Sequence, residues 1–161
     1  MSLAMNIDTT INPSPHQASS MARGRQLNQE GLALRRAGDL AGAEAKDLEA
    51  IRVKEAAFGS SHITTAISYN SLGEVYIRMG RLDDAERYLN LALAVREKIG
   101  MRNDLAGTRD NLAQVYEMRG DLQKAKEYRR GSEDAMCCGN YNSIFQHADW
   151  KRHKAYCQPS P

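Results

Sequence analysis

A short motif recurs three times along this chain, and the nearly constant distance between its copies limits the folds that the sequence can adopt. The motif is a glycine, a polar residue and a leucine, and its copies begin at Gly38, Gly80 and Gly120. The copies are 42 and 40 residues apart, and the same two offsets carry Ala43 onto Ala85 and then Ala125. Internal repeats of roughly 20–50 residues are typical of proteins built by stacking similar units. We therefore expect an array of about three units.

Each unit is expected to form two helices. In the second unit, apolar side chains recur mainly at three- and four-residue steps on both sides of Gly80, at Leu72, Val75, Tyr76 and Met79, then at Leu82, Ala85, Leu89 and Ala92. This spacing is typical of one face of a helix, and glycine commonly follows the last residue of a helix. One such hairpin cannot bury its apolar face alone. The sequence therefore predicts an all-α protein, an α-solenoid of about three antiparallel helix-hairpin repeats followed by a short C-terminal helix.

The pattern Leu72-Gly73-x-x-Tyr76, followed by Gly80, Ala85 and Ala92, resembles the tetratricopeptide repeat. The lengthened period, with a linker at residues 59–62, is similar to that of the repeats of kinesin light chains. The resemblance covers residues 21–136, with repeats at about 21–60, 61–101 and 102–136. It implies a non-catalytic scaffold that binds a peptide or partner protein on the concave surface formed by the first helix of each pair.

Two positions depart from this pattern in the outer repeats. The aromatic residue that the family often has early in the first helix is Tyr69 in the middle repeat, but the equivalent residues are Leu27 and Arg109. The large apolar residue in the second helix is Leu89, but the equivalent residues are Asp47 and Arg129. We therefore expect the outer repeats to pack less well than the middle one, or to act as caps.

The concave surface supplies the candidate binding residues. The polar side chains that the repeat register places there are Asn28, Arg35, Asn70, Glu74, Arg78, Asp110 and Gln114. An asparagine side chain can both donate to and accept from the backbone of a bound peptide, and the resemblance implies this role most clearly for Asn70. The alternative is that each of these residues is ordinary solvated surface.

The two ends of the chain lie outside the repeats. Residues 1–20 are polar, contain two prolines and show little periodicity, so we expect them to be disordered; a helical extension is the alternative. They also lack the order of a secretory signal. We therefore expect an intracellular protein, cytoplasmic or nuclear.

Residues 146–157 resemble the end of a MYND zinc finger, which makes residues 137–161 a MYND-like remnant. Residues that match that pattern are Gln146, Asp149, Trp150, His153, Lys154 and Cys157. The two preceding ligand positions hold Tyr141 and Phe145 in place of cysteine. The remaining soft donors are Cys137, Cys138, His153 and Cys157, and zinc needs about four. A zinc site is possible, although we expect no cofactor; the alternative is free thiols and exposed imidazoles.

Three function classes can be compared on these features. A peptide-binding scaffold is favoured over a zinc-binding adaptor whose tail recruits a partner. Catalysis is not expected, because no oxyanion loop or buried acid accompanies the cysteines and histidines. The net charge of +2 gives no case for nucleic-acid binding, and no apolar run is long enough to span a bilayer. The predicted partner is a protein or peptide, and a homodimer through the outer repeats is possible.

Overall fold

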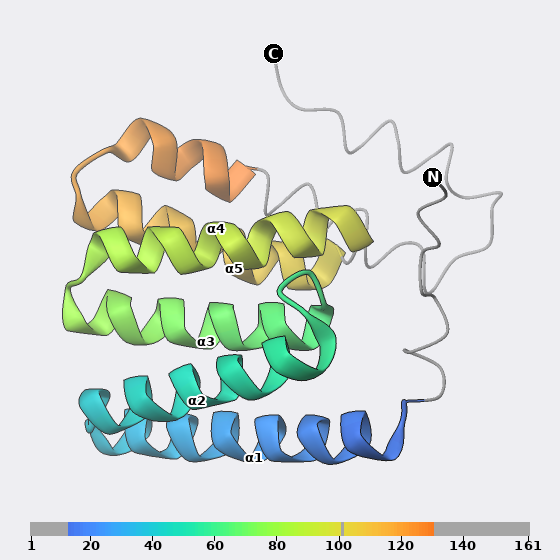
Figure 1. Cartoon of the computed structure of the whole chain (residues 1–161). Helices are drawn as coiled ribbons and strands as arrows, with labels where there is room; N and C mark the ends of the chain where they lie inside the picture. Colours follow the sequence, from blue (N-terminus) through green and yellow to red (C-terminus); the bar gives the residue numbers. More distant parts are fainter. Residues whose placement is uncertain (1–12, 101, 131–161) are drawn as a thin grey trace, which may run out of the picture.

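The computed structural model describes residues 13–100 and 102–130, and every regular element in these ranges is helical. The helices are α1 (Pro15–Ala37), α2 (Leu40–Phe58), α3 (Ile63–Met79), α4 (Leu82–Ile99) and α5 (Arg102–Met118), followed by a last helix over residues 122–130. Each helix stacks on its neighbour along the chain (Figure 1). The predicted α-solenoid of helix hairpins is confirmed. The predicted short C-terminal helix lies outside the described residues.

The recurring glycine ends the first helix of each hairpin. Gly38, Gly80 and Gly120 have φ angles of 87°, 73° and 81°, in the left-handed region that costs glycine little. At the second turn, the amide of Arg81 donates to the carbonyl of Tyr76 at 2.9 Å, which closes the helix end. The motif that repeats in the sequence is therefore the turn of each hairpin.

The middle hairpin is held together by a close approach of its two helices. A Cβ atom added to Gly73 would lie 2.6 Å from Cγ of Leu89, so only glycine fits there without movement. Ala85 and Ala92 on α4 are fully buried, as is Leu72 on α3. This hairpin supplies most of the main apolar core, to which α2 and α5 add a few residues.

The predicted disorder of residues 1–20 is wrong for residues 15–20, because α1 begins at Pro15. Ser14 caps this helix through a capping box: the amide of Gln17 donates to Ser14 Oγ at 3.2 Å, and the amide of Ser14 donates to Gln17 Oε1 at 3.0 Å. Proline is well tolerated at the first position of a helix. The Ser-Pro pair is therefore a helix start, while residues 1–12 lie outside the described part of the chain.

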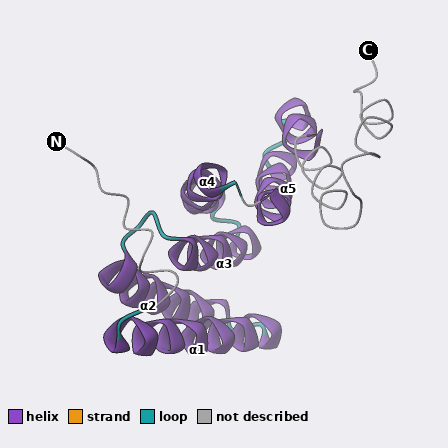
Figure 2. Ribbon diagram, turned by 90° about the vertical axis from the view of Figure 1, so that its right-hand side faces the viewer, coloured by secondary structure: helices purple, strands orange, loops and turns teal. Residues whose placement is uncertain are grey.

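Alternate helices form the two faces of the stack. α1 contacts α3, and α3 contacts α5. Figure 2 shows α1, α3 and α5 along one side, with α2 and α4 along the other. The side chains of the first helices thus meet on one surface, which is the concave face predicted from the sequence. In the described ranges, no helix combines the length and the apolar character needed to cross a bilayer.

Candidate functional site

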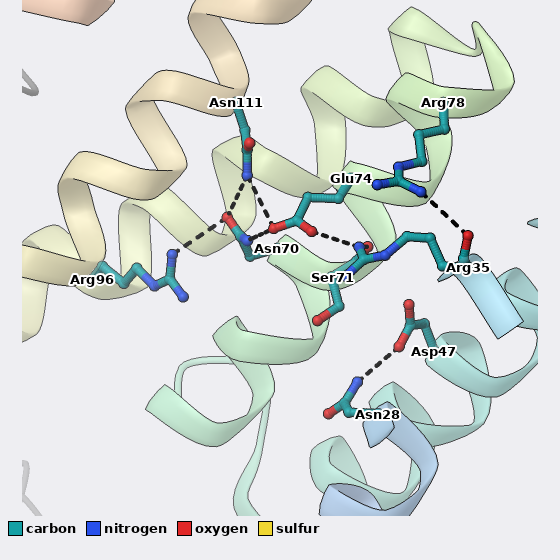
Figure 3. A network of polar contacts seen from close by, with 9 residues as sticks. All are labelled: Asn28, Arg35, Asp47, Asn70, Ser71, Glu74, Arg78, Arg96 and Asn111. Atoms are coloured by element: carbon teal, nitrogen blue, oxygen red, sulfur yellow. Dashed lines mark hydrogen bonds and ion pairs between the residues drawn. The ribbon is translucent and has the colours of Figure 1, made fainter. Parts of the chain in front are cut away.

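A carboxylate on α3 connects the three first helices of the concave face. Glu74 Oε2 accepts from Arg35 Nη1 on α1 at 2.5 Å. Its Oε1 accepts from Asn70 Nδ2 one turn earlier at 2.9 Å and from Asn111 Nδ2 on α5 at 3.4 Å. Figure 3 shows these contacts converging on Glu74. One side chain of the middle hairpin therefore contacts both of the outer hairpins.

Asn70, the strongest candidate from the sequence, is already hydrogen-bonded within the chain. Its amide nitrogen donates to Glu74, and its Oδ1 accepts from Asn111 Nδ2 and from Arg96 Nη1, both at 3.4 Å (Figure 3). A peptide backbone would have to replace some of these bonds in order to bind Asn70. The residue is part of the floor of the surface as well as a possible contact for a ligand.

Two arginines tie α1 to α3 at the far end of the same surface. Arg35 Nη1 also donates to the carbonyl of Ser71 at 3.3 Å, and only 10% of its side chain is exposed. Arg78 is exposed, and its Nη1 donates to the carbonyl of Arg35 at 3.2 Å. The contacts of Arg35 therefore stabilise the fold, whereas Arg78 remains exposed to solvent.

The structure places the two α5 candidates beside this network. Asp110 is half-buried and Gln114 is exposed. The α5 residue that reaches Asn70 and Glu74 is Asn111, next to Asp110 in the chain. The repeat register selected Asp110 because it is equivalent to Asn70, but the side chain that extends toward α3 belongs to its neighbour.

Asn28 belongs to a polar cluster between α1, α2 and α3. Its Nδ2 donates to Asp47 Oδ1 at 2.8 Å. Its Oδ1 accepts from Lys54 Nζ at 2.5 Å and from Ser68 Oγ at 2.8 Å, and Lys54 Nζ also donates to Ser68 Oγ at 2.7 Å. Asp47 and Lys54 are both almost fully buried. The cluster therefore holds two ionisable groups inside the first hairpin.

Glycines on α1 make room for these two side chains. A Cβ atom added to Gly31 would lie 3.0 Å from Asp47 Oδ1, and one added to Gly24 would lie 2.6 Å from Lys54 Cε. Burial raises the pKa of Asp47 to about 6, although the bond from Asn28 opposes the shift. Burial also lowers the pKa of Lys54 to about 8, against the attraction of Asp47. Both pKa shifts favour the neutral form of the side chain.

The second junction repeats this arrangement with a different cation. Arg96 is 42 residues after Lys54 and is also buried. It donates to Asn70, which is equivalent to Asn28, and to the hydroxyl of Thr108 on α5. Lys54 likewise donates to Ser68 on α3. The offset of 42 residues links the two cations in the sequence, but it does not show that they point inward.

A pocket of about 320 Å³ opens between α1 and α3. Its lining residues are Met21, Arg25, Asn28, Gln29, Leu32, Arg35, Lys54, Thr64, Ile67 and Ser71. Met21, Leu32 and Ile67 provide apolar walls, and Ile67 is 43% exposed. These apolar residues were not predicted from the sequence, because only polar side chains were expected to bind a ligand on this face. We call this cavity the α1–α3 pocket.

The proposed zinc ligands Cys137, Cys138, His153 and Cys157 lie outside the described residues. Across residues 13–100 and 102–130, no three side chains of the metal-binding types lie together in a way that could hold an ion. The zinc hypothesis therefore rests on the sequence alone.

Comparisons with known proteins agree with the repeat architecture. The fold is similar to that of BtubC (BKLC) from P. vanneervenii, known from a crystal structure, with a TM-score of 0.70 and 21% sequence identity. The similarity covers 95% of this chain and 55% of that one, so this chain spans little more than half the length of its structural relative. No curated protein sequence matches the present chain. The model of the tetratricopeptide repeat family matches residues 26–98 and 79–130. The chain belongs to the tetratricopeptide repeat family.

Proposed function

We propose that this protein is an interaction scaffold that binds an extended segment of a partner protein on its concave face. Tetratricopeptide repeats are generally protein–protein interaction scaffolds, which supports this class of function. The observation that supports the location is the α1–α3 pocket, whose apolar walls can receive one side chain of the bound segment.

The polar contacts of the concave face favour this pocket over the surface between α3 and α5. Around Glu74, the side chains of Asn70, Asn111 and Arg35 already satisfy one another. A ligand gains little from groups that must first break existing hydrogen bonds. Ile67 is instead an exposed apolar side chain at the wall of a cavity. Covering it removes apolar surface from water without breaking polar contacts.

The test begins with a displayed library of random peptides selected against the full chain. Peptides that bind are then measured against two variants by isothermal titration calorimetry. Ile67→Arg places a charge in the α1–α3 pocket and should abolish binding. Leu91→Arg makes the same change on α4, where Leu91 is 44% exposed and does not line the α1–α3 pocket. The Leu91→Arg variant should bind the selected peptides with the affinity of the wild type. Equal affinity for both variants would refute the proposed site.

A further inference from the structure

The junction between the first two hairpins is filled by three tyrosines. The rings of Tyr69 and Tyr88 have centroids 6.0 Å apart, and those of Tyr76 and Tyr88 are 5.7 Å apart. The hydroxyl of Tyr69 donates to Glu55 on α2. Tyr69 is only 3% exposed, and its side chain extends from α3 to contact both α2 and α4.

The next junction retains two of these rings but lacks the third. Tyr116 and Tyr128 occupy the positions of Tyr76 and Tyr88, and their rings stack with centroids 5.4 Å apart. The residue in the position of Tyr69 is Arg109. Its Nη2 forms an ion pair with Glu97 Oε1 at 3.1 Å, which matches the bond from Tyr69 to Glu55. The polar contact is therefore retained while the aromatic ring is lost.

A cavity of about 550 Å³ lies at this place. Its described lining residues are Leu93, Glu97, Arg109, Tyr116, Lys124, Glu127 and Tyr128. Their equivalents one repeat earlier are Ile51, Glu55, Tyr69, Tyr76, Asp84, Arg87 and Tyr88. The cavity thus corresponds, residue by residue, to the cluster that Tyr69 completes in the first junction. We call it the aromatic slot.

We propose that Trp150 of this same chain occupies the aromatic slot. The described residues end at Arg130, on the helix whose Tyr128 and Glu127 line the slot, and 31 further residues follow. About 20 residues separate Arg130 from Trp150, and an extended chain of that length reaches about 66 Å. This is several times the length of the helix along which the chain must return.

The chemistry of tryptophan fits the slot. An indole supplies the missing ring, and its Nε1–H can donate to a carboxylate, as the Tyr69 hydroxyl donates to Glu55. Glu97 has half of its side chain exposed and can accept this bond. Lys151 and Arg152, which follow Trp150, come close enough in sequence to pair with Glu127 at the rim. Trp150 would then supply the aromatic contact that the second junction lacks at Arg109.

This inference is independent of the proposed peptide site. The aromatic slot is lined from α4, α5 and the last helix, and it shares no lining residue with the α1–α3 pocket. Failure of one proposal therefore leaves the other standing.

The test uses fluorescence, because Trp150 is the single tryptophan of the chain. In the full-length wild type, emission should be shifted to shorter wavelength than that of free N-acetyltryptophanamide, and acrylamide should quench it weakly. Arg109→Tyr restores the residue of the first junction and should fill the slot. Its emission should move to longer wavelength, and acrylamide quenching should rise. The control is Arg52→Tyr, the same substitution at an exposed position of α2, which should match the wild type.

Two results would overturn the proposal: an exposed Trp150 in the wild type, or a Trp150 that stays equally protected in Arg109→Tyr. A second variant covers the case in which Arg109→Tyr does not fold. Glu127→Lys reverses a charge at the rim of the slot and should also increase quenching. The control is Glu49→Lys on α2, where the side chain is 44% exposed, and it should leave quenching unchanged. Trp150→Ala should lower the melting temperature of the wild type but leave that of Arg109→Tyr unchanged.

Discussion

Lys54 and Arg96 occupy equivalent repeat positions, and each places a buried cation between its own hairpin and the next. Lys54 donates to Asn28 on α1 and to Ser68 on α3. Arg96 donates to Asn70 on α3 and to Thr108 on α5. Both cations are less than a tenth exposed. Buried charges cost free energy unless they are well paired, so the stability of each junction depends on the polar partners of its cation.

Asp47→Asn should raise stability at neutral pH. The folded protein raises the pKa of Asp47 from 3.8 to about 6, so the folded state binds the proton more tightly than the unfolded state does. Stability contributed by this group is therefore lost as pH rises from about 4 to about 6. The amide removes that loss while retaining an acceptor for Asn28. Urea unfolding should show a gain on the order of 1–3 kcal/mol at pH 7 and none near pH 3.5. An equal effect at both pH values would contradict this assignment.

Lys54→Met should remove a pH dependence of stability at alkaline pH. Burial lowers the pKa of Lys54 from 10.5 to about 8, so between these values the unfolded state binds more protons than the folded state. The free energy of unfolding of the wild type should then rise between about pH 8 and pH 10. Methionine has a similar length and no charge, so this slope should disappear. The comparison is made by urea unfolding at several pH values, with the exposed Lys98→Met as the control.

The same glycine-to-alanine change should lower stability at one position and raise it at another. Gly73→Ala adds a Cβ atom 2.6 Å from the buried Leu89 and should destabilise by about 1–3 kcal/mol. Gly107 lies in the middle of α5, is exposed, and has nothing within 4 Å of an added Cβ atom. Gly107→Ala should stabilise by about 0.5–1 kcal/mol, since alanine favours a helix. Thermal unfolding of both variants tests whether the helices of the middle hairpin approach as closely as described.

Asn70→Ala should lower stability even without a ligand. The substitution removes a partner of the buried Arg96 and of Glu74, and an unsatisfied buried group costs about 1–3 kcal/mol. Gln114→Ala, at an exposed position on the same face, should change stability by less than about 0.5 kcal/mol. If Asn70→Ala leaves stability unchanged, the side chain of Asn70 does not contribute to the fold and is available to bind a ligand.

The purified full chain should bind fewer than two zinc ions. Tyr141 and Phe145 stand where the MYND pattern requires cysteines, and each zinc ion needs about four soft ligands. Elemental analysis after dialysis without chelator measures the content directly. Two tightly held ions per chain would restore the zinc-binding adaptor as the leading function.

The sequence predicted the fold because the positions of Gly80, Ala85 and Gly73 constrain the backbone itself. Such positions repeat whenever the geometry repeats, so their spacing is visible without a structure. The contacts of the candidate site residues could not be predicted from this spacing. Asn28 and Asn70 share a repeat position, yet Asn28 faces a buried Asp47 where its counterpart faces Glu74.

The contacts that the sequence could not reveal join residues of different repeats. The ion pair of Arg35 with Glu74 links α1 to α3, and neither residue follows the repeat pattern. The departure at Arg109 was visible as a missing aromatic residue, but only the structure shows the cavity that results. The repeat pattern identifies the residues that all units share, whereas the binding surface is formed by residues that differ from one unit to the next.

The position of Glu74 has a mechanical consequence. Because this carboxylate contacts α1, α3 and α5 at once, a change in the angle between the first two hairpins should disturb a contact that joins the second hairpin to the third. We therefore expect the two angles between neighbouring hairpins to change together. A partner that pulls the first hairpin away from the second would strain the third, whose turn at Gly120 lies 82 residues after that at Gly38.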